Sequence, residues 1–426
     1  MTIDSSWIVA LTKSVPEAFT CDLTFTPGAI FCDGQIRLCA PCHSEGTLTW
    51  DDYIHRQYEL YLRRCYASGV DTVIMAFDDY NHVPTAKSMT QSKRRKNIPQ
   101  IDFSDRDALP PTVPESDVWG QYMANRTFKT RLIHLLTFTL GKRALQQLTP
   151  NQSLIIDWQD QPLLFRGGAL EPEPLTQLAP LGESDVKFVQ YAGMFPKIQV
   201  DSIDGDSIPI ALLKLQTGFE GNFSIYHLET KVDPPTRKRL VTGEPAPPPK
   251  RQRVYEHVII RILYNGILRR VIPKRGGIQG HEISMLVSLI GLSGTDFTRS
   301  LPLVSGKTLY EMIPDIWPAL TRTYDPDTRS LVTDRVADIL IAKIYHMKFQ
   351  KHTEGGTFAS LLTQINASKL GEKTKQALPS APEVHCNARN INWLLAYWTH
   401  LQYPDPIQYQ YGFARSRNVK ISHDDQ

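Results

Sequence analysis

The first third of the chain alternates short apolar runs with a helical segment. Residues 28–33 and 71–77 are mostly apolar runs, the kind that form strands buried on both faces of a parallel sheet. Between them, residues 51–69 carry apolar side chains at helical spacing. The first run ends in Asp33, and the second is followed by Asp78. Because a right-handed strand–helix–strand unit brings the carboxyl ends of its strands to one sheet edge, we expect these two aspartates to be neighbours.

Residues 179–212 continue this alternation and contain two pairs of acidic residues. Residues 184–194 have apolar side chains at helix-like intervals, whereas 198–200 and 208–212 are predicted to be extended. One acidic pair therefore opens a helix, and the other ends a strand. In open α/β sheets, ligands bind beyond the carboxyl ends of strands and at the amino ends of helices, so we expect both pairs to reach one point.

The first pair is Glu183 with Asp185, and the second is Asp204 with Asp206. Four carboxylates held together repel one another and take up protons unless cations neutralise them. Such a cluster favours a hard divalent cation, magnesium or manganese, because these ions take oxygen ligands. The alternative is an aspartate-rich turn that only separates a helix from a strand.

Composition limits the class of protein. With 426 residues, of which 41% are apolar, the chain can form one large core or two of ordinary size. The formal charge of +3 is too small to indicate a polyanionic partner by itself. The apolar runs are far shorter than a membrane span and no signal-peptide pattern is present, so we expect no membrane contact and an intracellular location.

The cysteines are too sparse for a disulfide framework, since the chain has six of them, and we expect free thiols. Cys39-Ala-Pro-Cys42-His43 matches the C-x-x-C-H pattern of covalent haem attachment, which requires export, and it also offers the ligand types of a zinc site. Because nothing indicates export, small buried thiols are the favoured interpretation.

A basic segment, residues 84–96, follows the second aspartate. On a helix, one face would hold four of its side chains at i, i+4, i+7 and i+8, namely Lys87, Gln91, Arg94 and Arg95. Three cations and an amide on one face suit a nucleic-acid phosphate. The alternative is a solvated basic face.

Two further basic segments lie later in the chain. Residues 118–148 are predicted to be helical and carry Arg126, Lys129, Arg131, Lys142 and Arg143. They would form either a charged lining for a nucleic-acid strand or an ordinary amphipathic core helix. Residues 234–253 are Pro-rich and basic, which is typical of a nuclear-localisation signal, a nucleic-acid tether or an exposed insertion that carries no targeting signal.

Two helices are predicted near the carboxyl end, at residues 333–351 and 387–401. The second carries Trp393, Tyr397 and Trp398. We expect these aromatic side chains to pack the helix onto the core, with base stacking as the alternative.

The order of these motifs resembles the metal-dependent 5′ nucleases, a superfamily that includes flap endonucleases and Xrn-type 5′→3′ exoribonucleases. Residues 84–95, P-x-A-K-x-x-x-Q-x-x-R-R, look like the Xrn pocket for a 5′-monophosphate. The acidic motifs of the superfamily are similar to the strand-end aspartates Asp33 and Asp78, to Ala179-Pro-x-Gly-Glu183-x-Asp185, to Asp204-Gly-Asp206, and to the closing aspartate motif at Asp296-Phe.

The resemblance implies a PIN-like α/β fold whose parallel sheet carries a two-metal site. Residues 1–315 would form the nuclease core, with a helical arch at about 79–150 and the basic insertion at about 231–255, and residues 316–426 would form a helical carboxyl-terminal region. The implied catalytic acids are Asp33, Asp78, Glu183, Asp185, Asp204, Asp206 and Asp296, all of them metal ligands except Asp33. The implied phosphate-binding residues are Lys87, Gln91, Arg94 and Arg95.

The function that the resemblance implies is hydrolysis of phosphodiester bonds in RNA or DNA, from or near a 5′-phosphorylated end. Two Mg²⁺ or Mn²⁺ ions would be the cofactors, and nucleic acid would be the partner. This sequence departs from the superfamily at Asp185, where a glutamate is usual, and after Asp296, where the G-x-G of a duplex-gripping hairpin is absent. The alternatives are a flap-type, structure-specific DNA endonuclease and a catalytically inactive nucleic-acid-binding scaffold derived from the nuclease fold.

Overall fold

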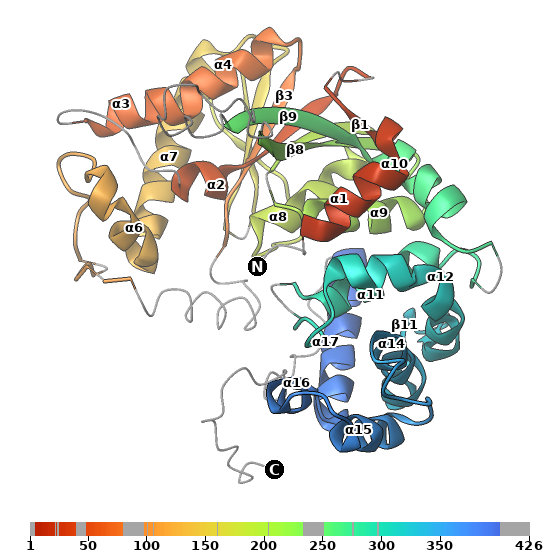
Figure 1. Cartoon of the computed structure of the whole chain (residues 1–426). Helices are drawn as coiled ribbons and strands as arrows, with labels where there is room; N and C mark the ends of the chain where they lie inside the picture. Colours follow the sequence, from red (N-terminus) through yellow and green to blue (C-terminus); the bar gives the residue numbers. More distant parts are fainter. Residues whose placement is uncertain are drawn as a thin grey trace, which may run out of the picture.

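A nine-stranded sheet lies at the centre of the chain in this computed structural model (Figure 1), in the order β1-β9-β8-β7-β2-β3-β4-β5-β6. The structure describes residues 5–21, 23, 25–39, 48–79, 98–99, 101–104, 106–159, 161–202, 204–232, 251–274, 277–295 and 298–400, with the backbone alone at 5, 227–232, 251–256 and 400. The sheet is covered by helices, and the predicted α/β fold is confirmed.

Five neighbouring strands form the parallel part of the sheet: β8 (Asn222–Val232), β7 (Lys197–Asp201), β2 (Ala29–Asp33), β3 (Thr72–Ala76) and β4 (Ser153–Asp157). Antiparallel strands extend both ends: β9 (Arg251–Ile259) and β1 (Phe19–Thr20) beyond β8, and β5 (Leu163–Arg166) and β6 (Glu173–Pro174) beyond β4. The predicted strands at 28–33 and 71–77 are β2 and β3, and every residue of both is buried.

Alternate side chains of the central strands supply two hydrophobic layers. In β2, Ile30 belongs to one buried cluster and Phe31 to the other, and in β3 the same division separates Val73 from Ile74. This alternation follows from strand geometry, which points successive side chains to opposite faces. Both faces of the two central strands are therefore apolar, and their acidic residues lie at the strand ends.

The layer on the Ile30 face is made by α3 (Trp50–Ile54), a π-helical turn (His55–Glu59), α4 (Leu60–Ala67), α6 (Ser116–Ala124) and α7 (Arg126–Gln147). The layer on the Phe31 face begins with α1 (Ser5–Ser14), α8 (Ser184–Lys187), a 3₁₀ helix (Phe188–Gly193), α9 (Ser207–Gln216), α10 (Ile260–Gly266), a π-helical turn (Ile267–Val271) and α11 (Glu282–Ser293). Short helices also lie at Pro16–Ala18 and at α2 (Gly34–Cys39). No helix in the described ranges is both long enough and apolar enough to cross a membrane.

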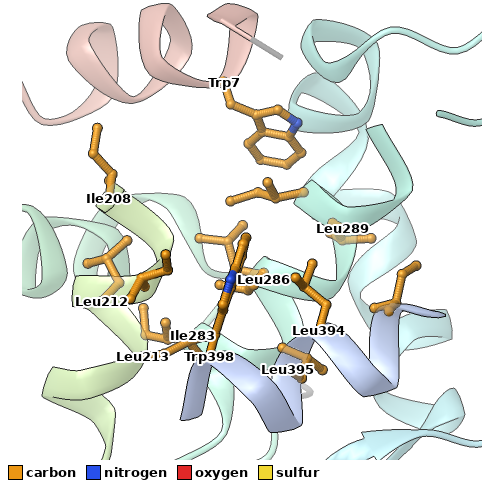
Figure 2. Close-up of a cluster of buried hydrophobic side chains, with 14 of the residues drawn as sticks. Trp7, Ile208, Leu212, Leu213, Ile283, Leu286, Leu289, Leu394, Leu395 and Trp398 are labelled. Carbon is orange, nitrogen blue, oxygen red and sulfur yellow. The ribbon is translucent and has the colours of Figure 1, made fainter. Parts of the chain in front are cut away.

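The carboxyl-terminal region is helical, as predicted. It contains α12 (Gly306–Thr323), the short strands β10 (Tyr324–Asp325) and β11 (Ser330–Leu331), α13 (Thr333–Arg335), a π-helical segment (Val336–Ile341), α14 (Ala342–Lys348), α15 (Phe358–Ala367), α16 (Glu372–Ala377) and α17 (Ala381–His400). The boundary expected after residue 315 falls within α12. Figure 2 shows Leu394 and Trp398 of α17 among Leu212 of α9 and Leu286 of α11. The aromatic residues of α17 therefore pack onto the core, as predicted.

One predicted strand is wrong: residues 208–212 lie in helix α9. The run is buried on every side, so it shows no periodicity that separates a helix from a strand. Pro209 is tolerated because it is the third residue of the helix, where the backbone N–H would have no partner within the helix. The second acidic pair consequently lies in the connection between β7 and α9, with Asp206 at the N-cap of α9.

The segment predicted as an arch contains α6 and α7. Helix α7 packs against β4 and β5 and buries Leu136, which matches the core-helix alternative for residues 118–148. Of its cations, Lys129 is buried, and Arg143 forms ion pairs with Asp51 of α3 and with Glu59 of the π-helical turn. Residues 80–97 lie outside the described ranges, and the arch itself remains a prediction.

Strands β8 and β9 extend into the segment predicted as an insertion. They pair antiparallel up to Val232 and Arg251, so the segment that connects them is 233–250, which lies outside the described residues. The cysteines that the structure describes, namely Cys21, Cys32, Cys39, Cys65 and Cys386, are free thiols, as predicted. Cys42 and His43 lie outside the described residues.

Candidate metal centre

Four adjacent parallel strands each end at or next to an aspartate on the same edge of the sheet. In spatial order these are Asp201 of β7, Asp33 of β2, Asp78 two residues beyond β3, and Asp157 of β4. The register places Asp33 beside Ala76, and Ala76 beside Asp157, so the strands end at the same level. The expected pairing of Asp33 and Asp78 at one edge is therefore observed within a longer row of acids.

The two outer aspartates of this row are paired with cations. Asp157 Oδ1 lies 2.8 Å from Nζ of Lys187, and both side chains are buried. Its Oδ2 accepts hydrogen bonds from Tyr191 at 2.7 Å and from Gln190 at 3.1 Å. Asp201 lies 3.3 Å from the guanidinium of Arg37. These two carboxylates are engaged within the protein.

The two inner aspartates meet at Ser184, the first residue of α8. Its Oγ lies 2.9 Å from Oδ1 of Asp33 and 3.2 Å from Oδ1 of Asp78, and its backbone N–H donates to the same oxygen of Asp78 at 3.0 Å. The neighbouring loops are tied by a hydrogen bond from the N–H of Asp79 to the carbonyl of Gly182 at 2.8 Å. These bonds fix the start of α8 against the ends of β2 and β3.

Three carboxylates form a cluster next to this point. One oxygen each from Asp185, Asp204 and Asp206 lie within 4.8 Å of one another. Asp185 follows Ser184 in α8, and the N–H of Asp206 donates to Oδ1 of Asp204 at 3.1 Å, which folds the second pair into a turn. Asp185 and Asp206 are buried, and Asp204 is half-buried. The predicted convergence of the two acidic pairs is therefore observed for three of their four members.

The donor set of this cluster fits a hard divalent cation. All three groups are carboxylates, which suit Mg²⁺ or Mn²⁺ better than the soft metals that thiolates prefer. The cluster consists of carboxylates alone, so oxygen atoms supply its ligands.

The other predicted site residues lie outside the cluster of three carboxylates. Glu183 is buried at the N-cap of α8, one residue before Ser184. The roles of Asp33, Asp78 and Glu183 as catalytic residues stay predictions, since the cluster of three does not include them. Asp296 and the phosphate-binding set Lys87, Gln91, Arg94 and Arg95 lie outside the described residues.

Sequence reasoning missed three residues of this edge: Ser184, Lys187 and Asp157. The signal for Asp157 was present, because residues 153–157 (SLIID) form an apolar run that ends in an acid, as β2 does. No local signal marks Lys187, since a lysine on a short helix is ordinarily solvated. Ser184 is separated by more than 100 residues from both aspartates that it contacts.

No family model matches this sequence, and no curated protein matches it. Solved structures of the catalytic core of Rad2 align with this chain at a low TM-score. Two structures of that core in complex with a DNA substrate match 74% of this chain, with 12% identity and a TM-score of 0.38, and the match covers 68% and 69% of the respective Rad2 chains. At this identity, neither a substrate nor an activity carries over to this chain.

Proposed function

We propose that this protein is a metal-dependent nuclease that hydrolyses phosphodiester bonds of RNA or DNA, from or near a 5′-phosphorylated end. The observation that carries the proposal is the convergence of Asp185, Asp204 and Asp206 within 4.8 Å at the carboxyl edge of a parallel sheet. Three carboxylates this close repel one another strongly, and a scaffold protein has no need of such an arrangement.

Asp185, Asp204 and Asp206 would hold the metal. Divalent ions bound to such a site supply an activated water and positive charge opposite the leaving oxygen. Two neighbouring residues fix the position of α8, which carries Asp185. Ser184 is hydrogen-bonded to Asp33 and Asp78 at the start of α8, and Lys187 at its end pairs with Asp157 of β4. Rate enhancement by metal sites depends on such fixed ligand orientation.

The preference for a 5′-phosphate rests on the sequence pattern of Lys87, Gln91, Arg94 and Arg95. A terminal monophosphate carries up to two charges and three acceptor oxygens, which three cations and an amide bind with charge-assisted hydrogen bonds. A hydroxyl end lacks these acceptors. Each charge-assisted bond contributes about 1.5 to 3 kcal/mol, so a hydroxyl end should be cut at least about tenfold less efficiently.

The test is a cleavage assay with single-stranded RNA, single-stranded DNA and flap duplexes, each with a 5′-phosphate or a 5′-hydroxyl, in Mg²⁺ or Mn²⁺. We expect the wild type to cut a phosphorylated strand, Arg94→Ala to lose most of the phosphate preference, and Asp204→Asn to lose cleavage while it still binds the strand. Cutting of flap duplexes alone would favour the endonuclease alternative. Equal cutting by the wild type and Asp204→Asn would refute the metal centre, and a wild type that binds strands without cutting any would favour the scaffold.

A further inference from the structure

A cleft of about 250 Å³ lies in the carboxyl-terminal helical region, lined by residues of α12, the π-helical segment, α14 and the turn before α15. Ile339 and Ala342 form its apolar lining. Its polar lining comes from Arg322, Asp338, Lys343, His346, Gly355 and Gly356. No residue of the acidic edge lines it, so it is distinct from the candidate metal centre.

The cleft has an excess of positive charge. Arg322 and Lys343 are both exposed, and neither is in an ion pair with an acid of the described residues. Two ion pairs of the carboxyl-terminal region, Lys307 with Glu311 and Lys375 with Glu372, involve no residue that lines the cleft. Two cations that share one cleft repel each other, and an anionic ligand would relieve that repulsion.

The acid of the cleft, Asp338, has a structural partner. Its Oδ1 accepts a hydrogen bond from the backbone N–H of Phe358 at 2.9 Å, which is the first amide of α15. A carboxylate at a helix amino end is stabilised by the helix dipole. Asp338 therefore holds α15 in place, and the amide that it engages offsets part of its charge.

The imidazole of His346 is oriented by hydrogen bonds. Thr353 Oγ1 donates to the carbonyl of Phe349 at 3.3 Å and lies 2.8 Å from Nδ1 of His346. Either atom can be the donor in the contact between Nδ1 and Thr353, and in both cases the contact fixes the plane of the ring. The other ring nitrogen, Nε2, donates to a phosphate oxygen when it carries a proton and accepts from a P–OH group when it does not.

Two consecutive glycines close the cleft. Gly355 and Gly356 have φ values of +90° and +115°, a backbone conformation that side chains disfavour. Gln364 fixes this turn, since its Nε2 donates to the carbonyl of Gly355 at 3.0 Å and its Oε1 accepts from the N–H of Glu354 at 2.7 Å. The turn is therefore held in place without a side chain between its backbone and the cleft.

We propose that this cleft binds a phosphate group through Arg322, Lys343 and His346. Two cations, an oriented imidazole and a bare glycine turn, drawn from three separate segments, are the groups that bind phosphate oxygens. The cleft, at about 250 Å³, has room for a phosphate group. The phosphate belongs either to the backbone of a nucleic acid or to the free inorganic ion, and binding does not require the metal centre.

The test titrates the full chain, in EDTA, with inorganic phosphate and separately with a short single-stranded oligonucleotide that has a 5′-hydroxyl end. The cleft variant is Arg322→Gln with Lys343→Gln. The matched control is Arg335→Gln with Lys348→Gln, which removes the same charge from exposed residues of α13 and α14 that do not line the cleft. Thermal melting verifies that each variant is folded, and Lys343→Gln alone replaces the double variant if that one is not.

We expect the cleft variant to lose at least about tenfold in affinity for one of the two probes, while the control loses less than about twofold. Loss with inorganic phosphate identifies a small-anion site, whereas loss confined to the oligonucleotide identifies a contact with a nucleic-acid backbone. Equal weakening in the cleft variant and the control overturns the proposal, because it indicates nonspecific charge. Failure of the wild type to bind either probe overturns it as well.

Discussion

Replacing Lys187 by methionine should destabilise the fold by about 3 to 5 kcal/mol, which is the usual cost of leaving one member of a buried ion pair alone. The ammonium of Lys187 is fully buried and uses all three of its protons: it donates to Asp157 Oδ1 at 2.8 Å, to the carbonyl of Phe77 at 3.0 Å and to the carbonyl of Asp157 at 3.2 Å. Methionine keeps most of the length of the side chain, so the loss measures the charge and its hydrogen bonds rather than a cavity.

The measurement is the free energy of unfolding in urea. Lys142→Met on α7 serves as the control, because Lys142 is exposed and a substitution there should stay within about 0.5 kcal/mol. The double variant Lys187→Met with Asp157→Asn should recover part of the loss, since no charge is then buried without a partner. A loss below about 1 kcal/mol for Lys187→Met, or a double variant as unstable as the sum of the two single ones, would refute this reasoning.

Three further predictions concern the site, the hairpin and a thiol. Ser184→Ala should reduce cleavage about tenfold or more while the fold persists, because Asp33 and Asp78 lose the hydroxyl between them; unchanged turnover would contradict it. Replacing residues 233–250 by Asn-Gly should leave turnover on short substrates nearly unchanged, because β8 and β9 are directly paired at that point; a folded variant with no cleavage would show that the segment takes part in the chemistry. Burial raises the pKa of the Cys32 thiol to about 12. At about pH 8, iodoacetamide should therefore modify Cys32 at least about 100-fold more slowly than the exposed Cys21, as measured by peptide mass spectrometry. Equal modification rates at the two cysteines would refute the burial of Cys32.

The sheet and its acidic edge could be predicted where the signal is local. Buried strands in a parallel sheet give continuous apolar runs, and such runs alone predict that Asp33 and Asp78 lie at strand ends. The same kind of signal is present at Asp157, which the sequence analysis missed, and the structure shows that this acid is paired with Lys187. Which acid of the row is paired depends on residues far apart in the chain, and local patterns do not contain that information.

The error at residues 208–212 has a different origin. A helix that is buried on all sides has no polar face, so the apolar run of α9 lacks the period that identifies helices. The prediction of a strand rested on this short apolar run, and Pro209 is compatible with the first turn of a helix. Asp206 occupies the N-cap of this helix without a side-chain capping hydrogen bond, so no capping signal marked its start.

The most direct test of the account is calorimetric titration of Mn²⁺ into the full chain and into Asp204→Asn, with Asp315→Asn as a control that removes an exposed acid on α12. If Asp185, Asp204 and Asp206 form the metal centre, Asp204→Asn should weaken Mn²⁺ binding by at least about tenfold and abolish cleavage, while the control matches the wild type. Mn²⁺ binding and cleavage that are the same in the wild type and in Asp204→Asn would contradict the account.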